Sequence, residues 1–265
     1  MKKEILIVLG LILVVIIVAC GLWLRWYAVD FQHQKQIYET LTEDFLLEES
    51  APTVITTEKE IVGLEEPFTS SNHLTGLSAA SRLHDLAALQ AENPDCVGWL
   101  TIPDTPADYP LVWTPADPEY YLRRNFYGNF DSGGPPFLNG RNQPQAEDQN
   151  LIIYGHNMLD ESMFKPVLQY LTPNFRETHQ DIYLELDGIQ YHYQVITALE
   201  TNIRSPLYTY ADLSDIAERE NFCSPLLEET RLDAISPAEG YLTLSTCNNQ
   251  GGNSRVIGIA VLIGK

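Results

Sequence analysis

The sequence predicts a mainly β protein, either a closed barrel or a sandwich, that follows one apolar N-terminal helix. Eight short β-type runs separated by turn residues fill the chain after residue 94, and residues 5–24 form one unbroken apolar stretch. Strands and helices do not alternate as they would in a parallel, Rossmann-like sheet. At 265 residues with 45% hydrophobic content, the chain is long enough to bury one core of ordinary size.

The first element is the uncharged, largely apolar stretch of residues 5–24. Twenty helical residues cover about 30 Å, the thickness of a bilayer's hydrocarbon core. Lys2 and Lys3 precede the stretch and acids dominate after Arg25, so the positive-inside rule predicts a single-pass cell-membrane anchor with a cytoplasmic N-terminus and an extracellular remainder. Two alternatives stay open. One is a cleaved secretory signal, although no A-x-A pattern is present, and the other is a lipoprotein lipidated at Cys20, although the apolar run continues beyond it.

We expect three parts: a cytoplasmic tip and transmembrane anchor at residues 1–25, a helical stalk and linker at 26–77, and a main domain at 78–265. The spacing of apolar residues predicts a helix over 27–49, and the mixed Thr, Ser, Pro, Gly and acidic residues of 50–77 predict a linker. A second helix is expected over 78–92, capped by Ser78 and ended by Asn93-Pro94.

The main domain is expected to contain eight short, mostly antiparallel strands. Asp187-Gly188, between two alternating runs, is the strongest hairpin signal in the chain. Two helices are predicted to interrupt the strands, at about 162–171 and about 213–229. The expected strands cover residues 97–102, 109–113, 136–138, 151–155, 182–186, 189–200, 241–246 and 255–263.

Charge and cysteine content limit the possible partners. Residues 26–265 carry 13 basic and 35 acidic residues, a formal charge of −22, which disfavours nucleic acid and anionic lipid. A neutral or basic partner fits this charge, and so does a merely solvated acidic surface. No cysteine pair has zinc-site spacing and the six histidines form no close i, i+3 or i+4 pair, so neither a metal nor a cofactor is expected.

Three cysteines, Cys96, Cys223 and Cys247, follow the apolar stretch. An odd number leaves at least one thiol unpaired in a compartment where disulfides form. A bridge between Cys96 and Cys223 would leave Cys247 free, but the sequence does not establish that pairing.

Cys247 is a candidate nucleophile at the end of an apolar strand, in the stretch YLTLSTCNNQGGNSRV. A cysteine with an ordinary pKa of about 8.5 is mostly protonated at neutral pH, so it needs a base or cation nearby. His156 follows the apolar run NLIIYG, and Arg255 opens the strand after a Gly-Gly turn. If strands 241–246 and 255–263 are neighbours, Cys247 and Arg255 come close in any fold. Cys247 could then attack a carbonyl, His156 could protonate the leaving amine, and Arg255 could hold the oxyanion or the substrate backbone.

These motifs resemble the signature set of the sortases, surface transpeptidases of Gram-positive bacteria. The resemblance rests on YLTLSTC with the following arginine and on IIYGHNM. The stretch NPDCVGWLTIPDTPADYPLVWTPADPEYYL, the segment SMFKPVLQYL and the long helix before the cysteine strand are similar to class B in particular. About residues 80–265 are covered.

The resemblance implies a closed eight-stranded sortase-type β-barrel, with N-terminal helices and a long helix before the cysteine strand, as the catalytic domain. It implies that His156, Cys247 and Arg255 are the catalytic histidine, cysteine and arginine, and that Ser245 contacts the bound signal. The enzyme would cleave a surface protein's C-terminal sorting signal after threonine through a thioester on Cys247. It would then transfer the protein to an amine of a peptidoglycan precursor or of a pilin lysine. Where some relatives carry an acid just after the cysteine, this chain has Asn248 and Asn249.

Two other functions remain compatible with the sequence. A cysteine endopeptidase would use water in place of the amine, and a catalytically silent surface protein would only bind. Addition of an amine separates the first from a transpeptidase, and the reactivity of the Cys247 thiol separates the second.

Overall fold

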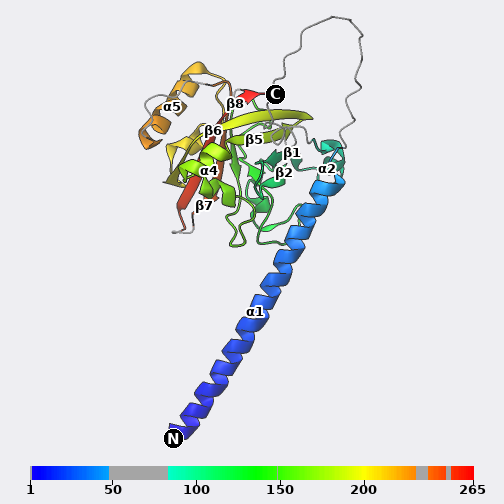
Figure 1. Cartoon of the computed structure of the whole chain (residues 1–265), viewed down its shortest axis with the longest axis vertical. Coiled ribbons are helices and arrows are strands. Elements are labelled where there is room, and N and C mark those ends of the chain that lie inside the picture. The colour runs from blue at the N-terminus through cyan, green and yellow to red at the C-terminus, as the bar shows by residue number, and fades with distance from the viewer. Residues whose placement is uncertain (1, 48–82, 148, 231–237, 249–251) are drawn as a thin grey trace, which may run out of the picture.

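The structure is a computed structural model that describes residues 2–47, 83–147, 149–230, 238–248 and 252–265. Figure 1 shows a compact barrel at one end of a long helix, α1, whose N-terminal half extends away from the barrel. The strands are β1 (Cys96–Thr101), β2 (Asp108–Val112), β3 (Phe137–Leu138), β4 (Asn150–Tyr154), β5 (Asp181–Leu186), β6 (Ile189–Asn202), β7 (Tyr241–Cys247) and β8 (Ser254–Gly264). The helices are α1 (Lys2–Asp44), α2 (Leu86–Glu92), α3 (Lys165–Gln169), α4 (Pro173–Thr178) and α5 (Ile216–Thr230), with short 3-10 turns η1 (Tyr120–Arg123) and η2 (Pro206–Thr209).

The eight strands form a closed barrel in the order β1-β2-β3-β4-β7-β8-β6-β5, with β5 pairing back to β1. Closure gives each of these strands a neighbour on both sides, which distinguishes this fold from the sandwich that the sequence left open. Two pairs, β2–β3 and β4–β7, are parallel, and the other pairs are antiparallel as expected. All eight predicted strands are confirmed, each within two residues of its expected bounds.

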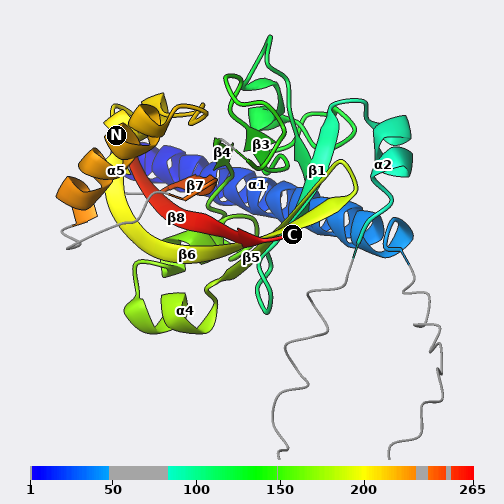
Figure 2. The ribbon, with the colours of Figure 1, turned by 90° about the horizontal axis from the view of Figure 1, so that it is seen from above.

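The predicted hairpin joins β5 to β6. Leu186 and Ile189 face each other across the strands, and Asp187 and Gly188 form the two-residue loop with φ values of 50° and 74°. Positive φ at both positions is what a type I′ turn requires, and asparagine, aspartate and glycine tolerate it best. The long strand β6 then curves across the barrel beside β8 (Figure 2).

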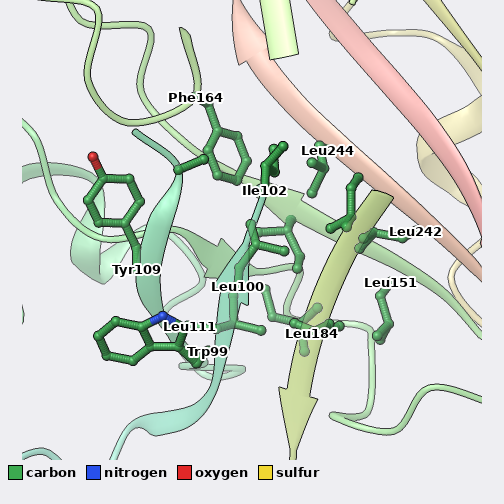
Figure 3. Packing of buried hydrophobic residues seen from close by; sticks show 14 of the residues in the cluster. Trp99, Leu100, Ile102, Tyr109, Leu111, Leu151, Phe164, Leu184, Leu242 and Leu244 are labelled. Atoms are coloured by element: carbon green, nitrogen blue, oxygen red, sulfur yellow. The ribbon is translucent and has the colours of Figure 1, made fainter. Parts of the chain in front are cut away.

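Large aliphatic side chains from opposite sides of the barrel meet in its interior (Figure 3). Leu100 and Leu111 from β1 and β2 lie in the same cluster as Leu184 from β5, Leu244 from β7 and Phe164 from the segment before α3, and all are almost completely buried. Trp99 is also fully buried, and its indole Nε1 donates to Asp108 Oδ1 at 2.7 Å. The alternation of inward and outward residues along each strand explains why these short segments form a barrel.

The N-terminal helices differ from the expected boundaries. The helix expected over 27–49 is the upper half of α1, which continues without a break from Lys2 to Asp44. The helix expected over 78–92 begins only at Leu86, because Asp85 caps it by accepting from the Ala88 N–H at 2.9 Å. His84 instead forms a β-bridge with Leu46 after the end of α1. Ser78 and the linker at 50–77 lie outside the described residues.

The bounds of the helices after β4 also differ from the predicted ones. The helix predicted over about 162–171 is the single-turn α3, and a second short helix, α4, follows it with Pro173 at its first position. The long helix before the cysteine strand is confirmed as α5, which begins three residues later than expected. Figure 1 shows α5 on the outside of the barrel next to β6.

Candidate active site

The parallel pairing of β4 with β7 brings two distant segments to the same edge of the barrel. Tyr154 and Ser245 are register partners at the ends of these strands, and the Gly155 N–H donates to the Ser245 carbonyl at 3.1 Å. The Thr246 hydroxyl donates to the Gly155 carbonyl at 2.9 Å. Because parallel strands end at the same edge, His156 and Cys247 both emerge there.

The antiparallel pairing of β7 with β8 adds Arg255 to this edge. Cys247 and Arg255 are direct register partners, as expected from the turn between the strands. The Arg255 guanidinium donates through Nη1 to the carbonyls of Ser254 and Gly252, at 2.9 and 3.1 Å. These bonds hold one side of the guanidinium against its own turn, and the residue lines the same groove as Cys247.

A groove of about 680 Å³ opens at this edge and contains all three predicted residues in its wall. The chain between β2 and β3 adds Glu119 and Leu122 to the lining of this groove, and the region of η2 adds Tyr208. This volume is in the range of pockets that hold small peptides and drug-sized molecules. The structure therefore joins the three candidate residues in one concave site.

His156 is held by a backbone carbonyl that the sequence did not suggest. Its Nε2 lies 2.9 Å from the Leu122 carbonyl oxygen. A carbonyl only accepts, so Nε2 carries the hydrogen and Nδ1 is the nitrogen left to exchange a proton. No side-chain signal could have revealed this partner, because the contact is with the main chain of η1.

Burial lowers the pKa of His156 below its ordinary value of 6.5, since a charged ring loses solvation there. The Leu122 carbonyl opposes that shift, and the positive charge of Arg123 adds to it. We therefore expect Arg123→Gln to raise the pKa of His156, because a like charge is removed. Titration of the His156 ring protons by NMR measures this, with His156→Gln to assign the signal and Arg176→Gln on α4 as the matched control. An unchanged or lower midpoint in Arg123→Gln would contradict the electrostatic explanation.

Gly155, which has no side chain, lies between the end of β4 and His156. A Cβ at this position would lie 2.6 Å from Cδ2 and 2.7 Å from Cδ1 of Phe164, a ring that is fully buried. Contacts this short force the ring or the backbone to move. The close approach of the ring explains why a residue without a side chain precedes His156.

We expect Gly155→Ala to cost about 1–3 kcal/mol of unfolding free energy, the usual range for overpacking. It should also reduce turnover, since His156 is the next residue. Denaturant unfolding and a peptide-cleavage assay measure the two effects. Gly264→Ala, where a Cβ meets nothing within 4 Å, is the control. Equal stability of the two variants would show that Phe164 has room to adjust.

Cys247 is a free and exposed thiol at the end of β7. The Asn157 side chain donates through Nδ2 to the Cys247 carbonyl at 2.9 Å. Asn157 directly follows His156, so this bond joins the segment after β4, which carries His156, to the end of β7, which carries Cys247. Asn157 is a position that the sequence interpretation missed, although its place in the stretch GHN next to His156 was a usable signal. Cys96 and Cys223 are also free and both are buried, so they do not form the bridge considered from the sequence.

Ser245 lies in the wall of the groove but is itself almost fully buried. Its hydroxyl shares a hydrogen bond of 2.8 Å with the Tyr208 hydroxyl. Burial raises the pKa of Tyr208 to about 12, so this phenol stays neutral and keeps a hydrogen to donate. The Tyr208 ring stacks on Tyr154, with centroids 6.1 Å apart. Tyr208 is thus a groove residue that sequence reasoning missed, because it comes from the connection between β6 and α5.

Within the described residues, no group of three or more His, Cys, Asp or Glu side chains could hold a metal ion. The described part of α1 from Ile7 to Asp44 contains a window with a mean hydropathy of 3.1, none of it buried, and is long and apolar enough to cross a membrane.

Comparison with known proteins identifies the family. The family described as the sortase domain matches residues 100–263. Sortase B of Listeria monocytogenes is 32% identical over 169 residues, which cover 63% of this chain and 68% of that protein. Among solved structures, a Staphylococcus aureus sortase B–substrate complex is 25% identical with a TM-score of 0.60, covering 68% of this chain and 84% of the other. Sortase B from Bacillus anthracis is 25% identical with a TM-score of 0.66, covering 89% and 99%. The chain therefore belongs to the sortase family of cysteine transpeptidases, and within it to class B.

Proposed function

We propose that the protein is a membrane-anchored sortase that cleaves the C-terminal sorting signal of surface proteins after a threonine and transfers them to an amine. The observation that carries this proposal is the convergence of Cys247, His156 and Arg255 on one groove through the β4–β7 and β7–β8 pairings. A nucleophile, a proton carrier and an oxyanion-binding cation at one edge are what acyl transfer from an amide requires.

In the acylation step, His156 takes the proton of the Cys247 thiol, and the resulting thiolate attacks the carbonyl carbon of the signal's threonine. The electron pair of the C=O bond moves to oxygen, and the Arg255 guanidinium stabilises that developing charge. The C–N bond then breaks, and the leaving amine takes a proton from His156. The product is a thioester between Cys247 and the threonine.

In the second step, an amine attacks the thioester carbonyl and loses its proton to His156. The C–S bond breaks, the Cys247 thiolate is released, and an amide joins the surface protein to its acceptor. The acceptor is an amine of a peptidoglycan precursor or of a pilin lysine. Ser245 and Tyr208 line the groove beside Cys247, and we assign them to binding of the sorting signal.

Residues 5–24 would anchor the enzyme in the cell membrane as a single pass, with the N-terminus inside the cell and the chain after residue 25, including the barrel, outside. The apolar half of α1 supports this, since its large hydrophobic side chains are exposed along the whole described length. The barrel would then face substrates and acceptors at the outer membrane surface. We also propose that the stalk and linker end at residue 77 and that the catalytic domain follows.

A peptide assay with and without an amine tests the proposal. Full-length protein is incubated with fluorogenic peptides of the Asn-Pro-X-Thr type and related pentapeptides, and with triglycine as acceptor. A transpeptidase yields the peptide's N-terminal part joined to triglycine, which mass spectrometry identifies. Hydrolysed product alone, even at high triglycine, would indicate an endopeptidase. Absence of both products and of a Cys247 acyl-enzyme across the peptide panel would indicate a binding protein.

A further inference from the structure

Two exposed apolar side chains lie on neighbouring loops of the barrel. Phe130, between β2 and β3, is 71% exposed, and Leu159, between β4 and α3, is 82% exposed. Among the described residues outside α1, no other large hydrophobic side chain is as exposed as these two. We call Phe130, Leu159 and the arginines Arg123 and Arg124 the rim. An isolated exposed apolar residue needs no explanation, but the position of this pair does.

Both loops lie against the same part of α1. Two residues after Phe130, the Ser132 hydroxyl accepts from Gln34 Nε2 at 3.0 Å. Next to Leu159, the Met158 side chain packs beside Gly133, where an added Cβ would lie 3.3 Å from Met158 Cε and 2.8 Å from Gln34 Oε1. The rim is therefore held beside α1 at the level of residues 30–34.

That level is close to the expected membrane surface. If residues 5–24 span the hydrocarbon core, Asp30 lies about 9 Å beyond its boundary, because a helix rises about 1.5 Å per residue. The headgroup layer on each side is about 5–7 Å thick, from the difference between the core and the full bilayer. Ser132 contacts both Asp30 and Gln34, and Gln34 lies about 15 Å beyond the boundary, so only the part of the rim on the Asp30 side is close enough to reach this layer. Trp23 lies at the end of the apolar stretch, and Trp26 and Tyr27 lie between that end and Asp30; these residue types collect at membrane interfaces.

The overall shape agrees with this placement. In Figure 1 the C-terminal end of β8 is on the upper side of the barrel, and α1 runs along one side of the barrel, with its N-terminal half extending below it. Since β7 and β8 are antiparallel, Cys247 and the start of β8 lie at the opposite end from that terminus. The groove is therefore at the end of the barrel that faces the N-terminal half of α1.

The rim contains two cations that can contact lipid phosphate groups. Residues 120–130 contain Arg123 and Arg124 and no acidic residue, while Glu119 and Asp131 flank them and Asp160 and Glu161 follow Leu159. Arg124 lies over the Tyr120 ring at 4.2 Å and donates to its carbonyl at 2.8 Å. The rim thus combines two apolar side chains with two cations, and the acids beside them favour a zwitterionic lipid surface over an anionic one.

We propose that the rim rests in the phospholipid headgroup layer and holds the groove at the membrane surface. The occupant of this surface is the bilayer itself. His156 is three residues before Leu159, and Leu122, whose carbonyl binds His156, precedes Arg123. Seating the rim fixes the height of the groove, so the enzyme favours substrates whose chains are themselves retained in the membrane. This inference rests on the membrane anchor of the proposed function.

A kinetic comparison in vesicles tests the proposal. Full-length protein is reconstituted in phosphatidylcholine vesicles and given one sorting-signal peptide in two forms, soluble and lipid-linked in the same vesicles. For Phe130→Ser combined with Leu159→Ser, we expect kcat/KM for the lipid-linked peptide to fall about tenfold, roughly 1.4 kcal/mol. The value for the soluble peptide should stay unchanged. The matched control is Ile189→Ser combined with Ile263→Ser, two exposed apolar residues at the other end of the barrel, which should change neither value.

A second measurement does not depend on activity. Trp replaces Phe130 or, as the control, Ile189, and quenching by phosphatidylcholine that carries a nitroxide on its headgroup is compared with wild type. We expect additional quenching for Phe130→Trp and none for Ile189→Trp. Equal quenching of the two, or equal loss on both peptides in the rim variant, would overturn the proposal. If wild-type protein cleaves neither peptide, the proposed function fails while the quenching result still decides whether the rim contacts lipid.

Discussion

Replacing Cys247 by alanine is expected to reduce cleavage of a sorting-signal peptide by on the order of 10³-fold or more, because no thioester can form without the sulfur. The fold should be unaffected. The Cys247 side chain is exposed, and the contact from Asn157 is made to its carbonyl, which alanine keeps. Initial rates of peptide release and the thermal unfolding midpoint measure the two expectations.

Cys20→Ala is the matched control for this variant, since Cys20 is also a free and exposed thiol but lies on α1. It should cleave the peptide at the wild-type rate and retain labelling by a thiol-reactive probe at Cys247. Normal turnover by Cys247→Ala would remove Cys247 from the proposed mechanism. It would leave the family assignment, which depends on the whole domain, unchanged.

Replacing Glu185 by alanine is expected to lower the free energy of unfolding by about 3–5 kcal/mol, the usual cost of removing one partner from a buried polar pair. His84 Nδ1 donates to Glu185 Oε1 and the His84 N–H donates to Oε2, both at 2.8 Å. Both side chains are only 2% exposed. The His84 ring also stacks on Trp99 with centroids 3.9 Å apart. Removal of the carboxylate leaves two buried donors without an acceptor.

Denaturant unfolding of the full chain in detergent micelles measures this effect. Glu177→Ala on α4, where the side chain is exposed, should change the unfolding free energy by less than about 0.5 kcal/mol. Glu185→Gln, which keeps one carbonyl acceptor, should fall between the two. A loss below about 1 kcal/mol in Glu185→Ala would mean that water or a neighbouring group replaces the carboxylate. Because His84 also bridges to Leu46, the same variant should loosen the attachment of α1 to the barrel.

Local signals predicted the strands and the main hairpin. The period-two pattern of apolar residues depends only on neighbours in sequence, and the Asp187-Gly188 turn depends on which residues tolerate positive φ. The proximity of Cys247 to Arg255 was predictable for the same reason, since two strands joined by a short turn pair with each other. The predicted start of α5 and the predicted cap of α2 were less accurate. For α2, Asp85 and Ser78 are both good caps, and only the bridge between Leu46 and His84 selects Asp85.

Other features depend on contacts between residues far apart in the chain. Nothing local indicates that β4 pairs in parallel with β7, a strand 91 residues later, and this pairing is what brings His156 to Cys247. Before that pairing is known, only the family resemblance links His156 to Cys247. The contact of His156 with the Leu122 carbonyl and that of Ser245 with Tyr208 are equally non-local.

The sequence by itself determined the apolar N-terminal helix, the β-rich domain, the strand positions and the proximity of Cys247 to Arg255, because periodicity, turn chemistry and motif spacing are local properties; the family resemblance linked His156 to them. The tertiary structure decided that the sheet closes into a barrel, that β4 and β7 end at one edge, and that Asn157, Tyr208 and the Leu122 carbonyl surround the groove. It also placed the rim beside α1. These are choices among possible partners for the same strands and loops, and only the packing of the whole chain selects one of them.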